Sequence, residues 1–178
     1  MQKLSPFIRL MRLDKPIGIL LLLWPTLWGL MFAANGQHDL KIILIFIAGV
    51  VIMRSAGCVI NDIADRNFDN KVKRTKQRPL ATGELSIKQA IILFFVLIGI
   101  AFFLVLQLNF ITILMSVVAV FLAASYPLAK RFTNLPQAHL GLAFAWAIPM
   151  AYTAYEAKLG SVCWLLFLTT AIWALIYD

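Results

Sequence analysis

The chain has 178 residues, of which 62% are apolar and only 13% are charged, and its mean hydropathy is +0.87. This composition excludes an ordinary soluble domain and predicts a membrane protein. The formal net charge of +8 does not indicate nucleic-acid binding, because every basic cluster flanks an apolar segment and no polar domain remains to present a binding surface.

The segment before the first long apolar run, LSPFIRLMRLDKP (4–16), mixes apolar side chains with Arg9 and Arg12. This pattern predicts a short helix that lies in the membrane interface. The first apolar run is long enough to cross a bilayer, and no small-residue cleavage site accompanies a shorter apolar core. We therefore expect no removable signal peptide.

Six apolar segments approach the length of about 20 residues that a helix needs to cross a hydrocarbon core. Each is a continuous run without alternation, so we expect helices rather than the strands of a barrel. The predicted fold is an all-α, polytopic membrane helical bundle that forms a single domain over 1–178. Its spans are expected near 17–34, 41–60, 90–108, 110–128, 138–155 and 161–177.

Basic residues are distributed unevenly about these spans. With the N-terminus inside, all 16 Lys and Arg residues lie on the inner side except Lys41 and Lys158, which are outside, and Arg54, which is within a span. By the positive-inside rule the N-terminus, the loop 61–89 and the loop 129–137 are expected to be cytoplasmic. Anionic membrane lipids and a phosphorylated substrate are the partners that suit such a surface.

The loop 61–89 begins with a dense acidic motif, NDIADRNFD. If the second helix continues to about Asp69, then Asn61, Asp62, Asp65 and Asp69 share one helix face, within an arc of about 100°. Carboxylates placed so closely repel one another, so we expect a cation among them. Mg²⁺ is the natural candidate, because it takes hard oxygen ligands and shares the phosphates of a substrate.

Basic residues follow the acids in KVKRTKQRP and could surround phosphate oxygens, arginine in bidentate fashion. The alternative is a solvated loop in which opposite charges neutralise each other. A second polar cluster, SYPLAKRFTNLPQ, puts Tyr126 and Lys130 on one face if the helix continues past Pro127. Lys130 and Arg131 are equally explained as a positive-inside anchor.

Arg54 is a basic residue deep inside a predicted span. It precedes Asp65 by eleven residues, which places it about 20° from the same helix face and about 16 Å deeper. Two interpretations remain open: a ligand-binding guanidinium at the inner end of the acidic face, or a structural arginine paired with backbone carbonyls.

The acidic motif NDIADRNFD matches the NDxxDxxxD signature of the UbiA superfamily of intramembrane prenyltransferases. The segments RLMRLDKPIGILLLLWPTLWGL, YPLAKRFTNLPQ and CWLLFLTTAIWALIYD resemble the bacterial branch that prenylates 4-hydroxybenzoate for ubiquinone synthesis. This resemblance implies a nine-helix fold around a cavity with two acidic motifs. Six of those helices are expected here, and Tyr177 and Asp178 match the start of the second motif, so we expect a C-terminally truncated, N-terminal part of the enzyme.

The resemblance also implies roles for individual residues. The expected metal ligands are Asn61, Asp62, Asp65 and Asp69. The expected diphosphate-binding residues are Lys73, Arg74, Arg78, Tyr126, Lys130 and Arg131. The residues expected to bind the carboxylate of the aromatic acceptor are Arg12 and Arg54.

The implied reaction is transfer of a polyprenyl group from polyprenyl diphosphate to the ring of 4-hydroxybenzoate, ortho to the hydroxyl, with Mg²⁺ as cofactor. It would take place at the bacterial inner membrane without an obligate protein partner. One alternative is a relative that uses another acceptor, such as a naphthoate or haem. An alternative of a different class is a divalent-cation transporter, which the lack of acids near the middle of the spans disfavours.

Overall fold

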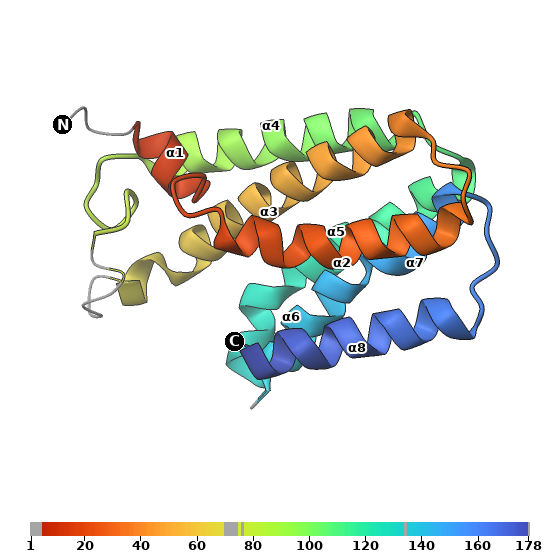
Figure 1. The fold of residues 1–178 in the computed structure, drawn as a ribbon. Coiled ribbons are helices and arrows are strands. Elements are labelled where there is room, and N and C mark those ends of the chain that lie inside the picture. The colour runs from red at the N-terminus through yellow and green to blue at the C-terminus, as the bar shows by residue number, and fades with distance from the viewer. Residues whose placement is uncertain (1–4, 70–74, 76, 134, 178) are drawn as a thin grey trace.

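The structure is a computed structural model that describes residues 5–69, 75, 77–133 and 135–177, without the side chains at 67–69, 128, 130 and 131. All regular elements in these ranges are helices, which confirms the predicted all-α class. Figure 1 shows them as a bundle of nearly aligned helices. Their bounds are α1 Pro6–Leu10, α2 Ile17–Ala34, α3 Leu40–Asp69, α4 Ile87–Val105, α5 Phe110–Phe132, α6 Pro136–Ala145, α7 Ala147–Ala154 and α8 Ser161–Tyr177.

Helices α2 to α5 are each long and apolar enough to cross a membrane, and α8 is a shorter apolar helix. The chain is therefore a multi-pass membrane protein. The predicted spans near 17–34 and 161–177 coincide with α2 and α8, while α3 and α5 extend beyond their predicted apolar cores. The common helix face of Asn61, Asp62, Asp65 and Asp69 required that this helix continue to about Asp69, and α3 does so.

The expected span near 138–155 is two helices instead of one. Trp146 ends α6 and begins α7. Pro149 gives a local reason, because proline has no N–H to donate to the carbonyl of Ala145, and its ring crowds that carbonyl. A proline also lies inside α5, at Pro127, but there the helix continues to Phe132, which meets the condition for a common face of Tyr126 and Lys130.

Local hydrogen bonds fix two of the helix starts. The side chain of Ser86 accepts from the backbone N–H of Gln89, and the Gln89 side chain accepts from the N–H of Ser86, which forms a capping box at α4. The side chain of Asn109 accepts from the N–H of Thr112 at the start of α5 and donates to the carbonyl of Thr153 at 2.6 Å. Asn109 therefore also ties α5 to the end of α7.

The helices pack in pairs along the bundle, α3 against α4 and α6 against α8. The first helix, the acidic end of α3 and the C-terminal end of α8 all lie at the same end of the bundle, on the left in Figure 1. The N-terminal helix and the acidic end of α3 thus lie at one end, and the apolar part of α3 runs away from it.

The contact between α6 and α8 depends on a glycine. A Cβ atom at Gly141 would lie 2.5 Å from the carbonyl oxygen of Ala171. We predict that Gly141→Ala forces the two helices apart and destabilises the fold by about 1–3 kcal/mol. Gly99→Ala on α4 is the matched control, because a Cβ there has no atom of the described part of the chain within 4 Å. Thermal unfolding in detergent should separate the two variants, and equal midpoints would contradict the predicted contact.

Candidate functional site

A cavity of about 740 Å³ lies between α2, α3, α4, α5, α6 and α7. Most of its wall is apolar, with side chains such as Phe46, Met53 and Phe102. Its polar lining includes Arg12, Arg54, Asn61, Arg78, Tyr126 and Gln137. A long apolar chamber with a few polar groups is suited to a ligand that has an apolar body and a charged or polar head.

Asp62 lies behind the polar lining and pairs with two of its arginines. Its side chain is only 2% exposed, and its Oδ1 lies 3.0 Å from Nη2 of Arg12 and 3.0 Å from Nη1 of Arg78. A buried carboxylate is costly unless it is paired, and here two guanidinium groups offset that cost. Three segments thus meet at one carboxylate: the connection before α2, the helix α3 and the loop that follows α3.

The neighbours of Asp62 on α3 complete a set of oxygen donors. Asn61 lines the cavity, and Asp65 lies one turn further along the helix and is half-buried. The side chain of Asp69, the last predicted member of this face, is outside the described residues. The acidic face is therefore described from Asn61 to Asp65.

The oxygen donors on α3 are of the kind that a hard metal ion prefers. Among the described side chains, no group of three His, Cys, Asp or Glu residues could hold a metal by itself. The amide of Asn61 and the carboxylates of Asp62 and Asp65 nevertheless offer hard oxygen ligands from one helix face. Mg²⁺ usually takes one or two carboxylates and completes its shell with waters and substrate phosphates, so these residues fit it.

Arg54 lies on α3 about two turns before Asn61, in the wall of the same cavity. Its Nε is buried and has no hydrogen-bond partner among the described residues, and its guanidinium carbon is 5.5 Å from the ring centroid of Phe144. A second cavity of about 190 Å³ also borders Arg54 and is lined in addition by Gly18, Trp173 and Tyr177. An unpartnered buried donor is unfavourable, so an anionic ligand would be stabilised here.

The remaining predicted site residues fall into two groups. Tyr126 is half-buried on α5 and lines the main cavity, and Tyr177 at the end of α8 lines the smaller one. The other group lies outside the described residues, either wholly or in its side chains. It consists of Lys73, Arg74, Lys130, Arg131 and Asp178.

Gln137 and His139 were not predicted as site residues from the sequence. Gln137 lines the cavity from the start of α6. His139 stacks on Tyr126 with 6.4 Å between ring centroids, and its Nε2 lies 3.0 Å from the carbonyl oxygen of Leu122 and 3.1 Å from Oγ of Ser125. A histidine at the start of an apolar helix was the available signal. Its partners on α5 depend on the packing of two helices and could not be derived from spacing.

These features define a class: a multi-pass helical membrane protein whose apolar cavity is lined by several arginines, two of which pair with a carboxylate of the acidic helix face. Residues 22–178 match the UbiA prenyltransferase family, and the chain belongs to this family. Membership favours the predicted enzyme over the alternative of a divalent-cation transporter.

The chain resembles named relatives in sequence and solved structures in fold. The 4-hydroxybenzoate octaprenyltransferase of Methylobacillus flagellatus is 56% identical over 99% of this chain and 60% of its own length. A solved UbiA homologue from Aeropyrum pernix K1 is 28% identical over 90% of this chain and 61% of its own, with a TM-score of 0.78.

A UbiA homologue from Archaeoglobus fulgidus, solved bound to DMAPP and Mg²⁺, shares the fold at 19% identity. Its TM-score is 0.79, and the match covers 95% of this chain and 61% of that one. The chain thus spans about 60% of the length of the relatives that it matches.

Proposed function

We propose that the protein containing this chain transfers a polyprenyl group from a polyprenyl diphosphate to the ring of 4-hydroxybenzoate, as the name of its 56% identical relative states for that protein. The observation that carries the proposal is a largely apolar cavity lined by Asn61, Arg12 and Arg78, where both arginines also pair with the buried Asp62. The proposed location is the bacterial inner membrane, with the acidic end of α3 on the cytoplasmic side.

The acidic end of the cavity is the proposed diphosphate site. Asn61, Asp62, Asp65 and, from the sequence, Asp69 would hold Mg²⁺, which when bound would stabilise the negative charge that develops on the leaving diphosphate. Arg78 and Tyr126 line the cavity and carry donors for phosphate oxygens. We propose the same role, from the sequence alone, for Lys73, Arg74, Lys130 and Arg131.

The apolar wall is the proposed site of the prenyl chain. Burial of each methylene contributes about 0.8 kcal/mol, so a long chain binds well among residues such as Val50, Ile98 and Val120. The wall also keeps water away from the allylic carbon as its bond to the diphosphate oxygen breaks. The ring carbon ortho to the acceptor hydroxyl forms the new bond to that carbon and then loses its proton.

We propose that Arg54 binds the carboxylate of 4-hydroxybenzoate. Its buried Nε needs an acceptor, whereas Arg12, the other candidate, is already paired with Asp62. Eight residues separate Arg54 from Asp62, or about 12 Å along the helix axis. That interval leaves room for the aromatic ring of the acceptor between its own carboxylate and the diphosphate.

Gly18 provides the space for this guanidinium. A Cβ at Gly18 would lie 2.7 Å from Nη2 and 2.8 Å from Nε of Arg54. We predict that Gly18→Ala displaces the flexible arginine and raises the KM for 4-hydroxybenzoate about tenfold, the effect of losing about one charge-assisted hydrogen bond. The KM for the prenyl diphosphate and the thermal stability should stay near the native values. Equal changes in both KM values would argue against a specific role of this contact.

The proposed function is tested with the complete native protein that contains this chain. Labelled polyprenyl diphosphate is incubated with Mg²⁺ and, in separate reactions, with 4-hydroxybenzoate, a dihydroxynaphthoate or haem, and the products are separated by thin-layer chromatography. We expect a prenylated product from 4-hydroxybenzoate that is lost when the metal is chelated. Product from another acceptor only would overturn the choice of substrate.

A further inference from the structure

The backbone at Arg12 is held in an unusual conformation. Its φ is +56°, in the left-handed region that residues other than glycine seldom adopt. Such a conformation persists only when the surroundings enforce it. The enforcing contacts include backbone hydrogen bonds from Arg12 N to the carbonyl of Arg9 at 3.2 Å and from Lys15 N to the carbonyl of Arg12 at 3.1 Å.

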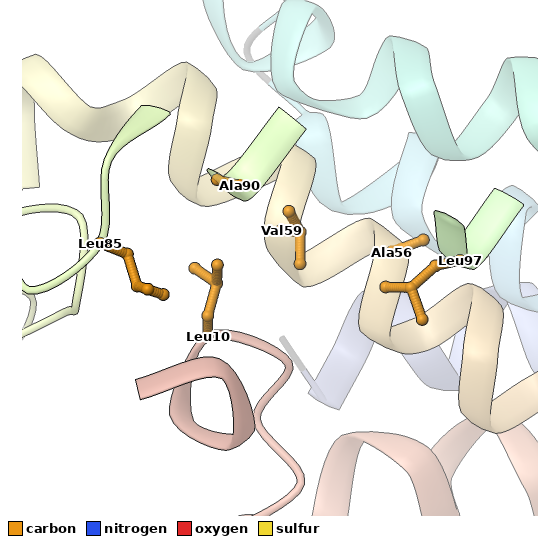
Figure 2. Close-up of a cluster of buried hydrophobic side chains, with 6 residues drawn as sticks. All are labelled: Leu10, Ala56, Val59, Leu85, Ala90 and Leu97. Carbon is orange, nitrogen blue, oxygen red and sulfur yellow. The ribbon is translucent and has the colours of Figure 1, made fainter. Parts of the chain in front are cut away.

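The short helix α1 is anchored to the rest of the bundle just before Arg12. Leu10 is fully buried in a cluster with Val59 of α3, Leu85 of the following loop and Ala90 of α4. Figure 2 shows Leu10 pointing from the N-terminal segment into this cluster. On the surface, Arg9 forms an ion pair with Glu84. Because such an exposed ion pair contributes little, the burial of Leu10 is what mainly holds the backbone of Arg12 near Asp62.

The side chains of Arg12 and Arg78 share one oxygen of Asp62, but they are not equivalent. The Arg12 side chain is 36% exposed and the Arg78 side chain is 19% exposed. Both also line the main cavity. Arg12 is thus the counter-ion that loses less packing if it leaves Asp62, and it has cavity space into which it can turn.

We propose that Arg12 is an exchangeable counter-ion, which pairs with Asp62 before substrate binds and donates its hydrogen bonds to the diphosphate afterwards. This inference rests on the proposed function. A divalent cation among Asn61, Asp62 and Asp65 would be repelled by two guanidinium groups in contact with the same carboxylate. The diphosphate brings negative charge that a planar guanidinium binds in bidentate fashion, so it provides Arg12 with a new partner when the metal takes Asp62.

The exchange predicts that removing the Arg12 side chain strengthens the binding of one ligand and weakens that of another. A purely structural role of Arg12 would not produce such opposite changes in affinity. The main variant is Arg12→Gly, because glycine accepts a positive φ without strain and the variant should fold. Without the competing cation, the Kd for Mn²⁺, measured alone by electron paramagnetic resonance, should fall about tenfold. The Kd for inorganic pyrophosphate in the presence of saturating Mn²⁺ should rise about tenfold or more.

Two further variants sharpen this test. Arg12→Lys keeps the charge but loses the bidentate geometry, so its Kd for Mn²⁺ should stay near the native value while pyrophosphate binds more weakly. Arg9→Gln is the matched control, because it removes one arginine from the same segment whose described ion pair is with Glu84 rather than Asp62. We expect it to change neither constant more than about twofold, as is usual for an exposed ion pair.

The outcomes separate this inference from the function on which it rests. Mn²⁺ binding by the native protein with no gain in Arg12→Gly overturns the exchange and leaves the proposed enzyme intact. Weaker binding of both ligands in Arg12→Gly also overturns it, because that result is expected of a structural residue. Failure of the native protein to bind Mn²⁺ overturns the proposed metal site together with the exchange. Opposite shifts support the exchange whichever acceptor the enzyme uses.

Discussion

Asp62→Asn in the complete native protein is expected to lower the rate of prenyl transfer by about 10²-fold or more, the usual scale for removing a preorganised charge from a catalytic site. Asp62 is the buried carboxylate of the acidic face and the shared partner of Arg12 and Arg78. Asparagine keeps the shape but removes the charge that a metal and two guanidinium groups require. The measurement is kcat with saturating Mg²⁺, together with the Kd for Mn²⁺.

The control for this variant is Asp39→Asn at the connection between α2 and α3. Asp39 is exposed, and its Oδ1 accepts from the backbone N–H of Lys41 at 2.7 Å, a capping role that asparagine fills equally well. We expect native activity from this control. Near-native activity of Asp62→Asn, or a loss of activity with an unchanged Kd for Mn²⁺, would contradict the proposed role of Asp62.

Arg54→Met is expected to raise the KM for 4-hydroxybenzoate about 10- to 100-fold, because a charge-assisted hydrogen bond contributes about 1.5–3 kcal/mol. The KM for the prenyl diphosphate should change little. Methionine fills a similar space and removes a buried donor that has no partner among the described residues, so the thermal stability should not fall. Lys88→Met, an exposed basic residue in the first turn of α4, serves as the control.

A second acceptor makes this test specific to the carboxylate. In 4-hydroxybenzamide the carboxylate is replaced by a neutral amide, so the native protein should bind it more weakly than the acid. The Arg54→Met variant should discriminate little between the two acceptors. If the variant raises both KM values by the same factor, Arg54 does not recognise the carboxylate, and the structural interpretation of this arginine is favoured.

Much of the fold followed from the sequence because a bilayer imposes a minimum apolar length on each spanning helix. The run from Ile17 to Ala34 was predicted at the residues where α2 lies. The break at Trp146 was not predicted, although Pro149 is visible in the sequence. Membrane helices often accommodate proline, as α5 does at Pro127, so a proline alone does not indicate a break.

The site was predictable where it depends on one helix. The spacing of Asn61, Asp62 and Asp65 fixes their common face as soon as α3 continues past them. The partners of Asp62 depend instead on tertiary structure, since Arg12 is fifty residues away and reaches it only because α1 docks through Leu10. The charges of this region do partly neutralise each other, as the solvated-loop alternative supposed, but the Arg78 to Asp62 pair is largely buried.

The central claim is that the acidic face of α3 holds the metal and the diphosphate at the end of the apolar cavity. Crystals of the complete native protein with Mn²⁺ and an unreactive prenyl thiolodiphosphate would test it by anomalous diffraction. We predict an anomalous peak against the carboxylates of Asp62 and Asp65, with the diphosphate between the metal and Arg78 and the prenyl chain along the apolar wall. A metal peak away from α3, or a diphosphate at the opposite end of the bundle, would contradict the account.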